Sequence, residues 1–254
     1  MKRITLYLLL ICFVNSHLSF SQQRECITAN ASSSSKSLKN KYMKNVYKPL
    51  LNGSASFSYG RIEFTETLHY KSNPTPYVKH CIMDFVKIPN SGSVLPFICL
   101  TVNEDSVQYV SNRDSLYIIN HKNKTVMIKD FKETYQFLMN NPFLSFYAYW
   151  IAMYGPVQED FTLTYSKDTV FSAFTVPQLM DGDKPRNQSG YYQYIYHKKN
   201  KLLFQELYQP CDEWAEKLNF VKREYRLLSF KPIFSIAQVF DMIDFNGFKI
   251  IYNK

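Results

Sequence analysis

The spacing of apolar residues changes several times along the chain, and each change predicts a different kind of element. In residues 36–51 apolar positions recur every four residues with lysines on the other face, which predicts an amphipathic helix. Asn52-Gly53 ends that helix. From residue 62 the interval falls to two, which predicts a strand. The apolar face of this first strand carries Ile62, Phe64, Leu68 and Tyr70.

A meander of short strands follows the first one. Strands are predicted at residues 77–88, 94–102, 106–111, 115–120 and 125–129, with polar turns between them. This hairpin-like spacing favours an antiparallel sheet. Glu66 interrupts the first strand because it falls on the apolar face, so we expect it to lie at a sheet edge or to be paired.

Two helices are predicted in the middle of the chain, within residues 130–153. Asp130 and Glu133 fit a capping box at the start of the first helix, and Asn140-Asn141-Pro142 ends it. Residues 143–153 are apolar almost all round, which predicts a second helix that is buried on every side.

Strands resume after Gly155-Pro156. They are predicted at residues 161–165, 169–176, 191–197, 202–208 and 217–230, followed by a helix at 233–243 and a last strand at 248–252. We find no linker and no internal repeat in this order. The pattern therefore predicts that residues 36–254 form a single, mainly β (α+β) domain.

The first 21 residues have the three parts of a secretory signal peptide. Two basic residues precede an apolar run at residues 6–14, and Ser19 and Ser21 are the small residues that a signal peptidase requires. The apolar run is shorter than the ~20 residues that span a bilayer. Cleavage after Ser21 would leave a flexible leader at residues 22–35 and an exported, periplasmic or outer-membrane-associated protein. A lipoprotein signal ending at Cys12 is the alternative, but Ile11 is larger than lipidation sites favour.

Charge narrows the range of partners. The formal net charge is +9, and subtracting Lys2 and Arg3 leaves +7 for the mature chain, with lysines concentrated in residues 36–48. This basic face can contact an anionic membrane surface, or it can be only the solvated side of the predicted helix. Nucleic acid is not expected as a partner, because the chain is exported and has no groove-reading or stacking motif. After the signal, no apolar stretch reaches transmembrane length.

Four of the five cysteines remain after cleavage, enough for two disulfides in an oxidising compartment. Cys81 and Cys99 lie equally far along the chain from Asn90, which is part of a predicted turn. A hairpin centred there would place the two thiols opposite each other, so we expect a disulfide between them, with two buried free thiols as the alternative. Cys26 and Cys211 would form the second pair.

The sequence offers no catalytic constellation. The histidines of the mature chain lack metal-ligand spacing, and no G-x-S-x-G, S-x-x-K or H-E-x-x-H motif is found. With only seven glycines, the chain has no phosphate-cradling loop. We therefore expect no enzyme activity, no catalytic residue, no metal site and no cofactor.

The order of elements resembles the LolA/LolB-like fold of periplasmic lipoprotein carriers and of some Bacteroidetes envelope proteins. The resemblance rests on the leader and amphipathic helix before a long meander, on the strand pair within residues 114–126, and on the helices that contain Asn141-Pro142-Phe143-Leu144. It implies a curved antiparallel sheet, or incomplete β-barrel, with helices covering its concave apolar side. Arg61, in the first strand, is the residue to compare with the arginine that holds the lid closed in such carriers.

The resemblance also implies a ligand, namely a lipid, an acyl chain or a lipidated partner held under the covering helices. The expected lining residues are those that match these helices: Phe131, Tyr135, Leu138, Phe143, Leu144, Phe146, Tyr147 and Trp150. The alternative is a secreted adhesin-like or glycan-binding β-module, in which the same aromatic residues only fill a core. The two interpretations differ in whether the apolar helix at 143–153 covers an empty cavity or a filled one.

Overall fold

The computed structural model describes residues 40, 43–87, 96–112, 115–130, 132–133, 137–138, 141–148, 162–176, 180–181, 184–185, 189–232 and 245–252. The predicted signal peptide, the predicted leader and the predicted helix at 233–243 lie outside these residues. In the described part the chain is mainly β, with short helices, which confirms the predicted fold class.

One twelve-stranded sheet dominates the structure, in the order β14-β6-β5-β4-β3-β2-β1-β13-β12-β11-β8-β7. Two further short strands, β9 (Met180–Asp181) and β10 (Lys184–Pro185), pair with each other. The strands of the large sheet are β1 (Tyr59–Tyr70), β2 (Asn73–Val86), β3 (Phe97–Val102), β4 (Val107–Asn112), β5 (Leu116–Asn120), β6 (Thr125–Lys129), β7 (Thr162–Tyr165), β8 (Thr169–Val176), β11 (Gly190–His197), β12 (Leu203–Pro210), β13 (Lys222–Lys231) and β14 (Lys249–Tyr252).

The strands from β1 to β6 pair antiparallel in sequence order, as the meander predicted, and β13 joins the two halves of the sheet by pairing with both β1 and β12. The last strand, β14, is the exception because it runs parallel to β6. Strands β14 and β7 are the two outer strands of the described sheet, which is therefore open and not a closed barrel. Glu66 lies on β1 in the interior of the sheet, so of the two expectations for it only pairing remains.

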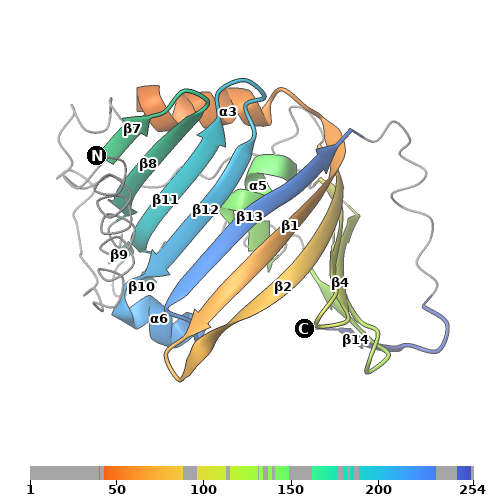
Figure 1. Ribbon diagram of the computed structural model, residues 1–254. Helices are drawn as coiled ribbons and strands as arrows, with labels where there is room; N and C mark the ends of the chain where they lie inside the picture. The colour runs from red at the N-terminus through yellow and green to blue at the C-terminus, as the bar shows by residue number, and fades with distance from the viewer. Residues whose placement is uncertain are drawn as a thin grey trace, which may run out of the picture.

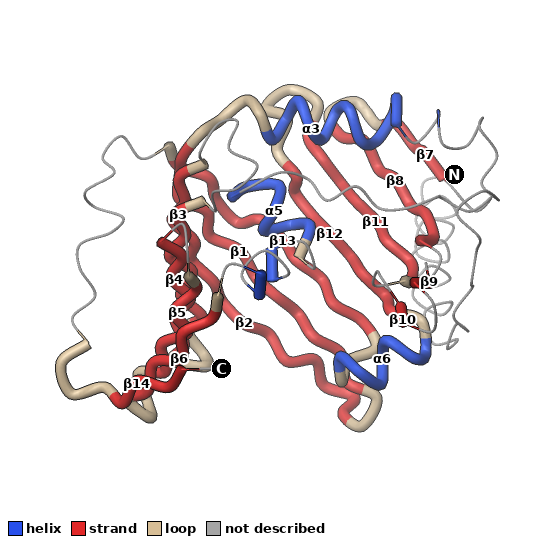
Figure 2. The backbone as a smooth tube through the Cα atoms, turned by 180° about the vertical axis from the view of Figure 1, so that it is seen from behind, coloured by secondary structure: helices blue, strands red, loops and turns tan. Residues whose placement is uncertain are grey.

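The sheet is strongly bent, so that β3–β6 and β14 stand as a wall beside the broader part formed by β1, β2 and β11–β13 (Figures 1 and 2). We call the face toward which the sheet bends the inner face. It carries Phe64 of β1, Met83 of β2, Tyr208 of β12 and Tyr225 of β13, which are all buried. The opposite face is the outer face.

Short helices flank the sheet. Helix α3 (Lys48–Ser54) runs along one end of the strands, and α6 (Asp212–Leu218) lies at the other end (Figure 1). Helix α5 (Pro142–Ala148) lies against the inner face (Figure 2). Because α5 sits inside the bend, the sheet and this helix together enclose the core.

The described apolar side chains form two cores, one on each face of the sheet. The main core lies on the inner face and includes Phe64, Met83, Phe143 and Tyr147. A smaller one lies on the outer face of the β3–β6 wall and includes Val110, Ile119 and Val126, with Cys99, Tyr117, Ile128, Phe245 and Phe248 packed against it.

Two predicted elements differ most clearly from the structure. Where the structure describes the helix predicted at residues 36–51, a π-helical turn, Met43–Tyr47, is followed by α3, which continues through Asn52-Gly53 to Ser54. The strand predicted at 217–230 begins only at Lys222, because α6 occupies residues 212–218. Asp212 and Glu213 in its first turn favour that helix, and Asn219 in the left-handed conformation ends it.

The predicted Cys81–Cys99 disulfide is wrong, and the two thiols are free. Cys81 pairs with Val102 and Cys99 with Asp84, so the hairpin is not centred on Asn90. Since successive residues of a strand point to opposite faces, this shift of register places the thiols on different faces of the sheet. Cys81 is part of the main core on the inner face, and Cys99 packs against the outer core. The Cys26–Cys211 pair involves Cys26, which lies outside the described residues, and stays a prediction.

We expect thiol counting to find both cysteines reduced. Under denaturing, non-reducing conditions the alkylated peptides of Cys81 and Cys99 should each carry one label. Under native conditions the half-buried Cys99 should react before Cys81, because burial raises the pKa of Cys81 to about 12 and little thiolate forms. A disulfide-linked Cys81–Cys99 peptide in the unlabelled protein would contradict this register.

Candidate functional site

Helix α5 is the apolar helix of the sequence, and all seven of its residues are buried. Pro142 begins it, as expected for a residue that lacks an N–H. The ring of Phe143 lies 5.3 Å from that of Phe64 and 5.2 Å from that of Tyr225, so the helix packs directly on β1 and β13. These contacts hold the N-terminal half of α5 on the inner face of the sheet.

The other half of α5 belongs to an aromatic cluster around Phe57, which lies just before β1. The Phe57 ring centroid is 5.8 Å from that of Phe146, 5.7 Å from that of Tyr147 and 5.2 Å from that of Phe230. Tyr147 also donates a hydrogen bond to the Leu203 carbonyl at 2.5 Å. In the described part of the chain, aromatic side chains therefore occupy the space between this half of α5 and the sheet.

Polar contacts hold both ends of α5. At its start, Asn141 accepts a hydrogen bond from Arg223 (3.0 Å) and another from the Tyr225 hydroxyl (3.1 Å). At its end, the Phe146 carbonyl accepts from the Ser54 hydroxyl (2.7 Å) and from Lys87 (3.0 Å). The helix is thus attached to β13 at one end and to α3 and the end of β2 at the other.

Lys87 is an unusually enclosed ammonium. Its Nζ donates to the Ser54 carbonyl (2.5 Å), to the Ser54 hydroxyl (2.8 Å) and to Phe146, and lies 4.2 Å from the centroid of the Phe57 ring. Burial lowers the pKa of Lys87 to about 7, while the oxygen acceptors and the ring face favour the charged form. Below that pH the Lys87 ammonium links α3, α5 and the sheet, but its burial makes the charged form less favourable in the folded chain than in water.

The pH dependence of stability should carry a signature of Lys87. Because its pKa is lower in the folded than in the unfolded chain, the folded state binds fewer protons between pH ~7 and ~10.5, and the free energy of unfolding should rise with pH there, by at most ~1.4 kcal/mol per unit. Urea unfolding of Lys87→Met at pH 7, 8 and 9 should lack this rise, whereas Lys48→Met, at an exposed lysine, should keep it. Parallel pH profiles for the wild type and Lys87→Met would contradict the assignment.

A buried ion pair lies beneath the start of α5. Arg223 of β13 is 7% exposed, Glu206 of β12 is 0% exposed, and their closest atoms are 3.7 Å apart. Among the described residues, neither carboxylate oxygen of Glu206 has a hydrogen-bond partner of good geometry. Burial raises the pKa of Glu206 to about 7, with Arg223 and the backbone amide of Phe143 acting against that rise. The ion pair is therefore buried next to helix α5, with little solvent to stabilise its charges.

A chain of polar side chains continues from this pair to the rim of the sheet. Tyr225 donates to Glu66 at 2.9 Å, Glu66 lies 3.7 Å from Lys79, and Lys79 pairs with Asp105 at 2.8 Å. These residues come from β13, β1, β2 and the β3–β4 turn. We call them, together with Arg223, Glu206 and Asn141, the polar belt. It crosses the otherwise apolar inner face from an interior carboxylate to a partly exposed one.

The structure brings together those expected lining residues that it describes. Leu138, Phe143, Leu144, Phe146 and Tyr147 all belong to the main core on the inner face. Phe131, Tyr135 and Trp150 lie outside the described residues. As predicted for a helix start, the Glu133 amide donates to the Asp130 carboxylate at 2.9 Å.

Sequence reasoning missed the polar belt, although it noted Glu66. Arg223, like Glu66, is a charged residue on the apolar face of its strand. It alternates with Tyr225 and Leu227, and this pattern could have drawn attention to it. Arg61, the arginine that the resemblance to lipoprotein carriers singled out, lies on the outer face and pairs with Asp84 through two contacts of 2.6 and 2.7 Å. The described arginine that reaches the covering helix is Arg223.

Within the described ranges, no group of three or more His, Cys, Asp or Glu side chains is placed to hold a metal ion. The helices of the described part include none that is long and apolar enough to cross a membrane. What the inner face provides is a large apolar surface with one line of buried charge.

Comparison with known proteins gives matches in structure but not in sequence. No family model matches the chain, and no curated protein is similar to it in sequence. Among solved structures, a LolA superfamily protein from Nitrosomonas europaea is 5% identical, with 77% of this chain and 97% of that chain covered and a TM-score of 0.36. A putative outer membrane lipoprotein-sorting protein domain from Vibrio parahaemolyticus is 9% identical, with 82% and 95% covered and a TM-score of 0.34.

A third similar structure is that of MucB in complex with MucA(peri), at 8% identity and a TM-score of 0.38. The match covers 76% of this chain but only 57% of that one, so the present chain spans little more than half of its length. At these identities and TM-scores the matches carry no argument about function. The similar structures thus include a LolA superfamily protein, the kind of protein that the order of elements in the sequence resembles.

Proposed function

We propose that this protein is an exported, periplasmic or outer-membrane-associated binding protein, which holds a lipid acyl chain or a lipidated partner against the inner face of its sheet. The single observation that carries the proposal is α5, a helix with no polar face, seated inside the bend of an open sheet. Such a helix has no solvent-facing role of its own. We infer that α5 covers the binding surface and moves to admit the ligand.

The energetics of this exchange favour a long alkyl chain. Burial contributes ~0.8 kcal/mol per methylene, so about ten methylenes would supply on the order of 8 kcal/mol before the cost of immobilisation. The ligand would replace ring contacts of Phe143, Phe146 and Tyr147 with contacts of its own. The polar ties at the two ends of α5 limit where the helix can move, because its ends are held at Asn141 and Phe146.

One observation favours the alternative of an adhesin-like or glycan-binding β-module with a filled core. The rings around Phe57 pack at centroid distances of 5.2 to 5.9 Å, as in an ordinary protein interior. On this alternative α5 never leaves the sheet, and no lipid accompanies the protein. The two functions therefore differ in a property that can be measured on unmodified protein.

Native mass spectrometry of protein purified gently from its own envelope tests the proposal. We expect a population whose mass exceeds that of the polypeptide by one lipid, and which loses that mass after organic extraction. A sample extracted and then exposed to the same envelope fraction should regain it. Protein of polypeptide mass alone, before and after such exposure, would favour the filled-core alternative.

A further inference from the structure

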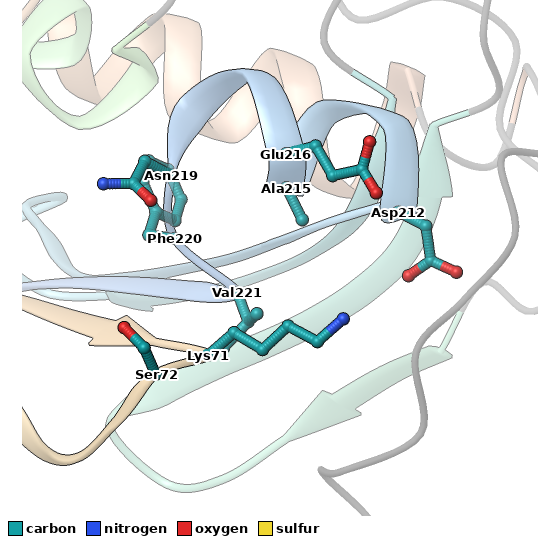
Figure 3. Close-up of a pocket in the computed structure, with 8 residues that line it drawn as sticks. All are labelled: Lys71, Ser72, Asp212, Ala215, Glu216, Asn219, Phe220 and Val221. Carbon is teal, nitrogen blue, oxygen red and sulfur yellow. The ribbon is translucent and has the colours of Figure 1, made fainter.

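A pocket of about 300 Å³ lies between the β1–β2 turn and helix α6, at the end of the sheet that α6 covers (Figure 3). This volume is at the lower limit of small-molecule sites. The pocket does not include any residue of α5 or of the polar belt, so the proposed acyl site does not account for it.

The pocket combines an apolar floor with charges of both signs. Ala215, Phe220 and Val221 supply apolar surface, and Phe220 is buried. Lys71 comes from the β1–β2 turn and extends across the pocket toward α6, from which Asp212 and Glu216 project (Figure 3). In the described part of the chain, none of these three charged side chains forms a salt bridge or a hydrogen bond with another residue.

Helix α6 carries two pairs of charged residues at the same spacing, one of opposite charges and one of like charges. Glu213 and Lys217 are four residues apart and pair at 2.7 Å, which is the favourable arrangement on a helix. Asp212 and Glu216 have the same spacing but like charges, which repel each other. The uncompensated pair is the one that lines the pocket, so a cation bound there would remove the repulsion.

We propose that this pocket binds a small zwitterion, with a primary ammonium between Asp212 and Glu216 and an anionic group on Lys71. Phosphoethanolamine has this chemistry, with an ammonium and a phosphate separated by two carbons. The short carbon chain would lie on Ala215, Phe220 and Val221. The same group occurs free in solution and as the head of a phospholipid, and the experiment separates these sources.

The test uses the full mature chain and isothermal titration calorimetry with O-phosphoethanolamine. We expect millimolar binding that is at least about tenfold tighter than for ethanolamine or inorganic phosphate alone. Asp212→Asn, Glu216→Gln and Lys71→Met should each weaken binding about two- to fivefold, and the double carboxylate variant more. Glu213→Gln is the matched control, because it removes a carboxylate of α6 that is already paired, and should leave binding unchanged. All these positions are on the surface, and melting curves establish that each variant is folded.

A vesicle arm identifies the source. If the site takes a lipid head, vesicles that contain phosphatidylethanolamine should retain the protein, phosphatidylglycerol vesicles should retain less, and the same variants should lose the difference. Binding of the soluble probe with no such preference assigns the site to a free zwitterion. Equal affinity for the two half-ligands, binding unaffected by the three variants, or occupancy by calcium alone would overturn the proposal.

Discussion

Replacing Arg223 by methionine should destabilise the folded protein by about 3–5 kcal/mol at pH 8, the usual cost of leaving a buried charge without its partner. Glu206 is wholly buried, and Arg223 is the cation that faces it, at 3.7 Å. The change also removes the hydrogen bond to Asn141 and with it one of the ties of α5. Urea unfolding followed by circular dichroism measures the loss.

Two further variants show whether the loss comes from charge. Adding Glu206→Gln to Arg223→Met should recover most of the stability, because no buried carboxylate then lacks a cation. Arg226→Met, on the exposed side of the same strand, should cost less than ~0.5 kcal/mol. An Arg223→Met protein as stable as the wild type, or a double variant with no recovery, would contradict this account of the pair.

The penalty of Arg223→Met should also depend on pH. The pKa of Glu206 is higher in the folded chain, about 7, than in the unfolded chain, about 4.5. Protonation of Glu206 therefore adds to the free energy of unfolding. This contribution is fully present below pH ~4.5 and is lost as the pH rises through ~7. In Arg223→Met the pKa should rise further, so the variant should approach the wild type at pH 5 and diverge from it at pH 8.

The second large effect is expected from Leu144→Glu on α5. Leu144 is 3% exposed and belongs to the main core, so a carboxylate there would be buried among apolar side chains. At pH 8 we expect both a loss of several kcal/mol of stability and the abolition of fatty-acid uptake. Near pH 5 the new carboxyl group should be neutral, and fold and uptake should both partly return.

Two controls separate the wall of a binding site from ordinary core packing. Leu228→Glu makes the same change at a side chain that is 56% exposed on β13, and should alter neither melting temperature nor uptake. Leu144→Ala should cost ~2–5 kcal/mol but keep the site apolar, so that a folded variant still takes up the probe. If Leu144→Ala stays folded yet loses uptake as completely as Leu144→Glu, the loss does not arise from charge on an apolar wall.

Elements defined by local patterns could be predicted from the sequence, because their causes lie within a few residues. The alternation of Ile62 and Phe64 predicted β1, and the polar turn at residues 198–201 predicted the β11–β12 hairpin. The apolar character of residues 143–153 predicted a helix buried on every side, and every residue of its described part, α5, is buried. For each of these, side-chain period and turn chemistry are sufficient.

Pairing between strands could not be predicted in the same way. The turn residues around Asn90 suggested a centre for the β2–β3 hairpin, but the loop is long and does not fix the register. Cys99 pairs with Asp84 and not with Cys81. The two cysteines therefore lie on opposite faces of the sheet as free thiols and do not form the predicted disulfide. The wrong prediction thus arose from register and not from the identification of the strands.

The polar belt was beyond sequence reasoning for a related reason. In the sequence of each strand taken alone, Glu66 and Arg223 are single charged residues on an otherwise apolar face, with no partner in sight nearby along the chain. Tyr225, the residue that links them, is 159 positions from Glu66 along the chain, and the two become neighbours only because β13 inserts beside β1. The order of strands in the sheet determines which buried charged residues become neighbours, and local sequence patterns do not reveal that order.

The proposed binding of an acyl chain is tested most directly by titrating the mature wild-type protein with a fluorescent fatty acid. The account predicts saturable uptake approaching one probe per chain, with displacement by unlabelled long-chain fatty acid but not by a short-chain one, because binding energy grows with each buried methylene. Circular dichroism of the same sample establishes that the protein is folded. Absence of saturable uptake by folded, delipidated protein would contradict the account and leave α5 as part of a filled core.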